Sequence, residues 1–157
     1  PYTVEAVLAA PPIVFPLTLP MCSPISDGAA AAVICNSAGL RKLAVSDDRA
    51  IRVLASVLQT SAERDPYDYD RHVTRLAAMR AYAMAGLGPL DVDVAEVHDA
   101  TAMGEIIEIE ALGLVPPGEG GIAAERGDTV IGGRIPVNPS GGLECKGHPI
   151  GATGLGQ

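Results

Sequence analysis

Two histidines stand where an imidazole can do chemistry, and His98 is the first of them. It follows directly on the apolar residues 92–97, which we expect to form a strand, and Asp99 comes next. Ligands of open α/β sheets bind beyond the carboxyl ends of strands, so this position favours a functional imidazole. The alternative is a histidine that caps the following helix or packs at the end of the strand.

His148 is the second, and it lies in the tripeptide Gly147-His148-Pro149, with Gly151 two residues further on. Proline fixes one backbone angle and glycine permits unusual ones, so the loop predicts a rigidly held imidazole ahead of a helix. Such an imidazole can act as a general base toward a thiol or hydroxyl, or donate a hydrogen bond to a developing oxyanion.

Other polar residues carry weaker signals. The turn Asn-Pro-Ser-Gly-Gly at residues 138–142 can bring backbone amides toward a ligand, but an ordinary loop has the same composition. Cys22 and Cys35 lack the helix N-terminus and the basic neighbour that activate a catalytic thiol. Cys145 and His148 have a spacing found in zinc sites, but the sequence holds no second pair of ligands, so we predict no metal site.

The hydrophobic pattern predicts an α/β scaffold for these residues. Strands are expected at residues 29–35, 51–58, 92–97 and 134–137. The order strand, helix, strand, helix, strand along the chain indicates a sheet with crossover helices.

Two helices are expected between these strands. The first covers residues 71–85, and its apolar stripe consists of Val73, Leu76, Ala77, Ala81 and Met84. The second begins after Asp99, and residues 118–133 behind it form a glycine-rich loop. Residues 1–24 are expected to be an extended arm, because a helix is excluded there by Pro11, Pro12, Pro16, Pro20 and Pro24.

The composition limits the classes of function. With 48% hydrophobic residues and a net charge of −8, the 157 residues indicate a globular protein without a nucleic-acid-binding surface. No apolar run approaches the roughly 20 residues that a membrane-spanning helix needs, so we expect no membrane insertion. Three cysteines without paired spacing indicate reduced thiols, and hence a cytoplasmic protein.

Residues 138–157 resemble the C-terminal signature of thiolases, and most closely that of the sterol-carrier-protein branch. The signature runs from Asn-Pro-Ser-Gly-Gly-Leu through Gly-His-Pro to Ala-Thr-Gly and the final glutamine. Residues 96–99, 110–114 and 22–31 are similar to further segments of that branch. One departure is Thr101, which stands where the branch commonly has an aromatic residue and leaves the acyl specificity open.

The resemblance implies a thiolase-like fold: a mixed sheet with crossover helices, one half of a layered αβαβα architecture. Residues 1–38 would be the end of the loop domain and the return strand of the N-terminal half. Residues 39–157 would be the C-terminal thiolase domain, incomplete at its C-terminus. Neither of the family's reactive cysteines matches a cysteine of this chain, so the nucleophile is expected outside it.

The same resemblance implies roles for five residues. His148 would activate the nucleophilic thiol and polarise the acyl oxygen, and His98 would help to hold the thioester oxygen, directly or through water. Ser23 would contact the pantetheine arm, and Asn138 and Gly147 are further candidates for binding substrate or coenzyme A. No bound cofactor and no metal are expected, since coenzyme A is a co-substrate.

The expected function is acyl transfer to coenzyme A, by thiolysis of a 3-oxoacyl-CoA or by condensation of acetyl-CoA, in a homodimer or homotetramer. One alternative is a thiolase-fold retro-aldolase of steroid side-chain degradation. Another is a non-catalytic protein that binds acyl-CoA or lipid on the same scaffold.

Overall fold

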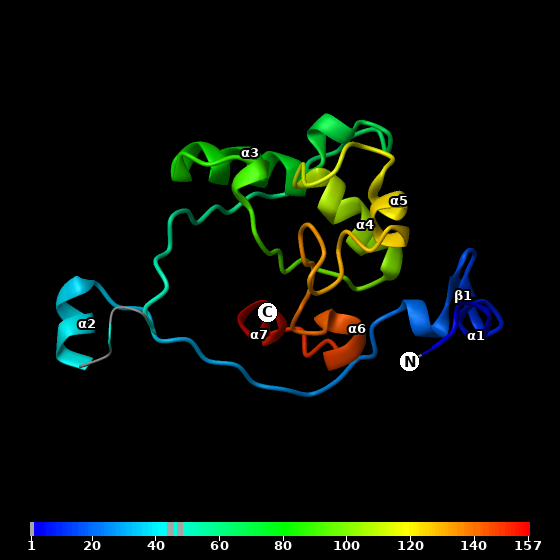
Figure 1. The fold of residues 1–157 in the computed structure, drawn as a ribbon, viewed down its shortest axis with the longest axis horizontal. Coiled ribbons are helices and arrows are strands. Elements are labelled where there is room, and N and C mark those ends of the chain that lie inside the picture. The colour runs from blue at the N-terminus through cyan, green and yellow to red at the C-terminus, as the bar shows by residue number, and fades with distance from the viewer. Residues whose placement is uncertain (1, 44–45, 47–48) are drawn as a thin grey trace.

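The computed structural model describes residues 2–43, 46 and 49–157 and shows a body of short helices from which a long loop extends (Figure 1). Two extended connections reach from the body to α2 and back, which leaves that helix apart from the others (Figure 1). In chain order the elements are α1 (Val4–Leu8), β1 (Pro12–Val14), β2 (Leu17–Thr18), η1 (Leu19–Met21), α2 (Ser37–Leu43), η3 (Tyr69–Arg71), α3 (Val73–Ala85), η4 (Pro89–Asp91), α4 (Ala102–Ala111), α5 (Gly120–Glu125), α6 (Gly142–Lys146) and α7 (Thr153–Gly156).

The expectation that residues 1–24 contain no helix is wrong. The short helix α1 ends at Leu8, before Pro11, so no proline interrupts it, and the Thr3 hydroxyl caps it by accepting a hydrogen bond from the Ala6 amide at 3.2 Å. Of the prolines beyond it, Pro12 lies in β1, Pro16 in the turn before β2, and Pro20 in η1. The Thr18 hydroxyl donates to the Val7 carbonyl at 2.7 Å and ties this pair to α1.

The helix expected over residues 71–85 is present as α3, but its buried face differs from the predicted stripe. Leu76 and Met84 are exposed, whereas Ala78 is buried. The helix packs on α4 and η3, and the Tyr82 hydroxyl donates to the Leu112 carbonyl at 3.0 Å. The hydrophobic periodicity predicts the helix correctly, but the positions of α4 and η3 decide which of its faces is buried.

The second expected helix, α4, is at the centre of the core. The Thr101 hydroxyl caps it by accepting from the Gly104 amide at 3.0 Å, and Ile109 is only 1% exposed. Around it lies one hydrophobic cluster, formed by Ala95, Val97, Ile109, Leu114, Val115, Ala123, Ile135 and Val137.

The loop expected at residues 118–133 contains a helix, α5, which begins at Gly120. The Gly120 amide donates to the Glu110 carboxylate at 2.8 Å, and a side chain on Gly120 would collide with Ile106 of α4. Glycine is therefore needed here for close helix packing, although its helix propensity is low.

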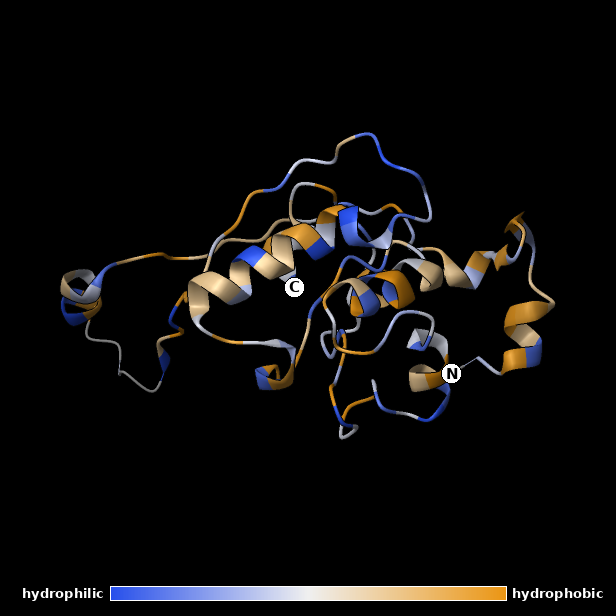
Figure 2. Ribbon diagram, turned by 90° about the horizontal axis from the view of Figure 1, so that it is seen from above, coloured by the Kyte–Doolittle hydropathy of each residue, from blue (hydrophilic) through white to orange (hydrophobic). Residues whose placement is uncertain are grey.

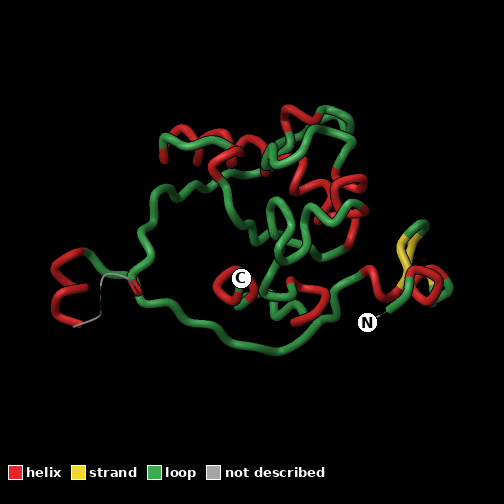
Figure 3. The backbone as a smooth tube through the Cα atoms, in the orientation of Figure 1, coloured by secondary structure: helices red, strands yellow, loops and turns green. Residues whose placement is uncertain are grey.

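The expected strands are mostly absent from the part of the chain that the structure describes. Residues 92–97 and 134–137 meet only in a parallel bridge between Ala95 and Val137. Residues 29–35 and 51–58 form extended connections without strand pairing to any described residue (Figure 3). A strand needs a partner for its backbone groups, and among the described residues these two segments have none.

The two extended connections carry hydrophobic as well as polar residues along their length (Figure 2). Val33 is 83% exposed and Ile51 is 91% exposed. None of the helices in residues 2–43, 46 and 49–157 combines the length and the apolar character that a membrane crossing requires.

Candidate active site

The fold brings His98 and His148 into direct contact. Their ring centroids are 4.9 Å apart and the ring planes meet at 76°, an edge-to-face arrangement. His98 lies in the turn that precedes α4 and is exposed, whereas His148 lies between α6 and α7 and is half-buried. Two motifs that are separated in the sequence thus supply adjacent imidazoles.

The segment around Ser23 connects the two histidine loops. The Ser23 amide donates to the Ala100 carbonyl at 3.0 Å, and the Pro24 carbonyl accepts from the His148 amide at 2.8 Å. Two further backbone bridges flank Ser23, one between Cys22 and Thr101 and one between Ile25 and His148. Of the residues expected to bind substrate, Ser23 therefore lies beside both histidines.

Asn138 joins the 138–142 turn to the segment that ends at His98. Its side-chain oxygen accepts from the Val97 amide at 2.8 Å, and its side-chain nitrogen donates to Glu105 at 2.9 Å. The residue is buried and has a φ of 49°, which asparagine tolerates better than most residues. Its amide is thus engaged within the protein, and its assignment as a binding residue stays a prediction.

Asp99, next to His98, fixes the start of α6. It is only 4% exposed, and its carboxylate accepts from the Leu143 amide at 2.8 Å. A side chain on Gly142 would overlap this carboxylate, and Gly142 also has a φ of 57°. A glycine at this position therefore lets the His98 turn and the loop before His148 approach each other closely.

Gly147 has a similar role on the other side of His148. Its φ is 82°, and a side chain there would collide with Ser26. The absence of a side chain allows the extended segment after Ser23 to pass directly beside the Gly-His-Pro loop.

The ring of His148 is held from within its own loop. Its Nδ1 lies 2.8 Å from the Thr153 hydroxyl oxygen, and that hydroxyl donates to the Pro149 carbonyl at 3.1 Å. Thr153 is the first residue of α7 and is 7% exposed.

The carboxyl groups of Asp99, Glu105 and Glu144 lie near one another. Burial raises the pKa of Glu144 to about 7, and the nearby charges of Asp99 and Glu105 add to this effect. Burial also raises the pKa of Glu105, partly offset by its hydrogen bond from Asn138. In the described part of the chain no group of His, Cys, Asp or Glu side chains is arranged to hold a metal ion.

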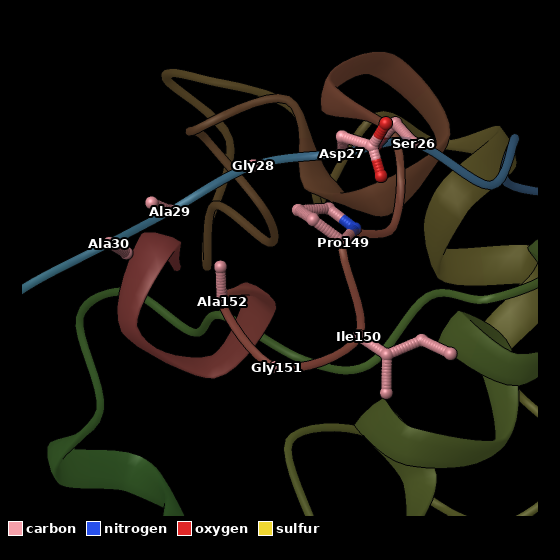
Figure 4. A pocket seen from close by; sticks show the side chains of 9 residues that line it. All are labelled: Ser26, Asp27, Gly28, Ala29, Ala30, Pro149, Ile150, Gly151 and Ala152. Atoms are coloured by element: carbon pink, nitrogen blue, oxygen red, sulfur yellow. The ribbon is translucent and has the colours of Figure 1, made fainter.

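A hollow of about 370 Å³ lies on another side of the Gly-His-Pro loop. In Figure 4 the extended residues Ser26–Ala30 pass over Pro149 and the turn at Gly151–Ala152, while the Ile150 side chain points away from them. Neither histidine lines this hollow.

The three cysteines are free thiols, and Cys35 and Cys145 are exposed. The residues that sequence reasoning missed are Asp99, Glu144 and Thr153. The sequence offers a hint for two of them, since Asp99 adjoins His98 and Thr153 belongs to the Ala-Thr-Gly segment of the signature. Glu144 had none, because its environment arises only from packing.

The fold places the chain among α/β proteins with the thiolase-like fold, as expected from the sequence. The model of the family described as thiolase C-terminal domain-like matches residues 55–157, and the chain belongs to this family. The boundary expected between residues 38 and 39 stays a prediction.

Curated relatives agree with this assignment. An acetyl-CoA acetyltransferase of Methanothermobacter thermautotrophicus is 46% identical, and the match covers 99% of this chain and 40% of the relative. Sterol carrier protein 2 of Oryctolagus cuniculus is 39% identical, with 99% of this chain and 29% of the relative covered. The chain thus spans well under half the length of these relatives.

A solved structure of the Ltp2-ChsH2(DUF35) aldolase has the same fold. It superposes with a TM-score of 0.71 and 23% identity, over 99% of this chain and 42% of that one.

Proposed function

We propose that the complete protein containing these residues is a thiolase-type acyltransferase that uses coenzyme A. The observation that carries the proposal is the direct contact of His98 with His148, at 4.9 Å between ring centroids. Two imidazoles at one point can divide proton transfer and oxyanion stabilisation between them. The identity of 46% with an acetyl-CoA acetyltransferase supports the same activity.

In thiolysis the proposed nucleophile is a cysteine thiol outside residues 1–157. His148 takes the thiol proton as the sulfur attacks the 3-oxo carbon of the substrate. The bond between carbons 2 and 3 then breaks, and negative charge develops on the oxygen of the departing acetyl thioester. His98 donates a hydrogen bond to that oxygen. Carbon 2 takes the proton that His148 holds, which gives acetyl-CoA. The thiol of coenzyme A then attacks the acyl carbon, its proton passes through His148 to the departing cysteine sulfur, and the shortened acyl-CoA is released.

Ser23 is proposed to contact the pantetheine arm of the substrate, because its segment is bonded to both histidine loops. Asn138 and Gly147 complete the proposed binding region. Asn138 holds its loop against the 92–97 segment, and Gly147 lets the segment after Ser23 lie close to the Gly-His-Pro loop. We also propose that the complete enzyme is a homodimer or homotetramer that needs no metal.

The test is thiolysis of acetoacetyl-CoA by the complete enzyme and its His148→Ala variant. We expect turnover to fall by at least ~10³, because one residue loses both its base and its donor role. Alkylation of the nucleophilic cysteine should also slow, since the thiolate fraction depends on a nearby base. His72→Ala is the control, because His72 lies at the start of α3 and outside the site.

A retro-aldolase is the second candidate, because one solved structure with the same fold is an aldolase. It would cleave a 3-hydroxyacyl-CoA to a carbonyl compound and a shortened thioester without added coenzyme A. Release of a ketone or aldehyde from such a substrate, with no thiolysis of acetoacetyl-CoA, would favour it. Ligand binding without either reaction would instead indicate a non-catalytic acyl-CoA-binding or lipid-binding protein.

A further inference from the structure

One side-chain contact of the His148 ring bears on which of its nitrogens carries the proton. The Thr153 hydroxyl oxygen lies 2.8 Å from Nδ1, and the same hydroxyl donates to the Pro149 carbonyl at 3.1 Å. A hydroxyl has one proton and two lone pairs, so with its proton on the carbonyl it can only accept from the ring. Nδ1 then carries a hydrogen, and in a neutral imidazole the lone pair is on Nε2.

We infer that Thr153 is a positioning residue that holds His148 in the tautomer protonated on Nδ1 and leaves Nε2 free as the base. The catalytic meaning of this assignment rests on the proposed function, whereas the tautomer itself does not. Thr153 touches no reacting atom and acts through His148.

The contact is built on a rigid turn. The Pro149 carbonyl also accepts from the amides of Ala152 at 2.8 Å and Thr153 at 3.0 Å, so the hydroxyl sits on a closed first turn of α7. The His148 amide donates to the Pro24 carbonyl at 2.8 Å, and the His148 ring packs edge-to-face with the His98 ring. Thr153 and His148 are therefore each held in place by other groups of the protein as well as by their mutual contact.

The direct test is nitrogen-15 NMR of the complete enzyme, labelled at histidine and observed at alkaline pH. His148 should show a protonated Nδ1 and an unprotonated Nε2. Thr153→Val removes the hydroxyl at nearly constant volume, and the pair Thr153→Ser and Thr153→Ala differs in the hydroxyl alone. This second pair keeps the test valid if the valine variant does not fold.

We expect Thr153→Ser to keep the tautomer and to stay within about threefold of the normal kcat. Thr153→Val and Thr153→Ala should lose the tautomer preference and lower kcat by about 10- to 100-fold, with little change in KM, as for other residues that orient a functional histidine. A purely structural role of Thr153 would lower the melting temperature without changing the histidine signals of the folded protein.

Protonation of His148 on Nε2 in the unaltered enzyme would overturn the inference, because the hydroxyl would then donate to the ring. An unchanged tautomer in the valine and alanine variants would overturn it as well. If the unaltered enzyme catalyses no thiolysis but the hydroxyl still controls the tautomer, the proposed function fails and the inference stands.

Discussion

At the scale of single residues, the site combines one exposed imidazole with neighbours whose polar atoms are already paired. Asn138, Asp99 and Thr153 each bond to groups of the loops around the histidines. His98 is exposed, and no hydrogen bond of its ring is present among the described residues. Its ring is therefore free for the role proposed above, and the paired residues hold their loops.

Replacing His98 should distinguish hydrogen-bond donation from proton transfer. His98→Asn should be far milder than His98→Ala, because an amide still donates, through a water molecule, toward the thioester oxygen. Loss of the donor should cost on the order of 3 kcal/mol of transition-state stabilisation. Affinity should change less than turnover, because the charge develops only during the reaction.

Steady-state kinetics of the two His98 variants in the complete enzyme give the answer. Equal damage from Asn and Ala would mean that His98 transfers a proton. No damage from either would return it to the role of a residue that only packs at the end of the 92–97 segment.

The Glu144 carboxyl should make stability depend on pH. Its folded-state pKa of about 7 lies above the ordinary 4.5, so between these values the folded protein binds more protons than the unfolded chain. Glu144 therefore lowers the free energy of unfolding only when it ionises: the stability associated with its protonated form is fully present below about pH 4.5 and is lost as the pH rises through about 7.

Glutamine cannot ionise, so Glu144→Gln should raise the free energy of unfolding of the complete enzyme more at pH 8 than at pH 5. The carboxyl is only half-buried, so solvent screening limits the gain to on the order of 1 kcal/mol. Denaturant unfolding at the two pH values measures it, with Glu125→Gln, an exposed carboxyl in α5, as control. Equal pH dependence in the two variants would contradict the assignment.

At the scale of elements, close contacts between loops hold the two histidines together. α6 has only five residues, and its start is held by the Asp99 carboxylate. α4 begins at the Thr101 cap, three residues after His98. The threonine that departs from the related branch thus has a structural role here as a helix cap.

Gly142→Ala should disturb this arrangement more than any other glycine change in the loop after Asn138. The new side chain would meet the Asp99 carboxylate in a backbone conformation with a φ of 57°. We expect a loss of roughly 2–4 kcal/mol in the free energy of unfolding, from strain and overpacking together. Gly151→Ala is the matched control, since a side chain there meets nothing within 4 Å. Thermal or denaturant unfolding that leaves the two variants equally stable would refute the close contact.

At the scale of the whole molecule, the body around α4 is packed, while the connections to α2 extend away from it (Figure 1). The packed body holds all the residues of the candidate site except Ser23, which comes from the start of the first extended connection. The cysteines are spread over this arrangement, and the structure records no hydrogen bond between any of their thiols and the histidine rings in the described part of the chain.

Replacing Cys22, Cys35 or Cys145 singly with Ser in the complete enzyme should keep turnover within about tenfold of normal. None of the three is placed as a nucleophile, and such thiols mostly serve packing. The thiolysis assay with acetoacetyl-CoA measures this, and His148→Ala provides the scale for a real catalytic loss. A fall of several orders of magnitude at one cysteine would identify it as the nucleophile.

The amino-acid sequence by itself determined the family, the two imidazoles and the helices α3 and α4. These depend on local features: a Gly-His-Pro motif, a histidine after an apolar segment, and helical periodicity ended by glycine. Tertiary structure decided the rest. The pKa of Glu144 is raised only because packing buries its carboxyl. Gly142 must be a glycine because the Asp99 carboxylate lies against it, and Thr153 contacts the His148 ring only in the folded loop. The same reason explains the missing strands at residues 29–35 and 51–58: an extended segment becomes a strand only when another backbone bonds to it, and no local pattern supplies that partner.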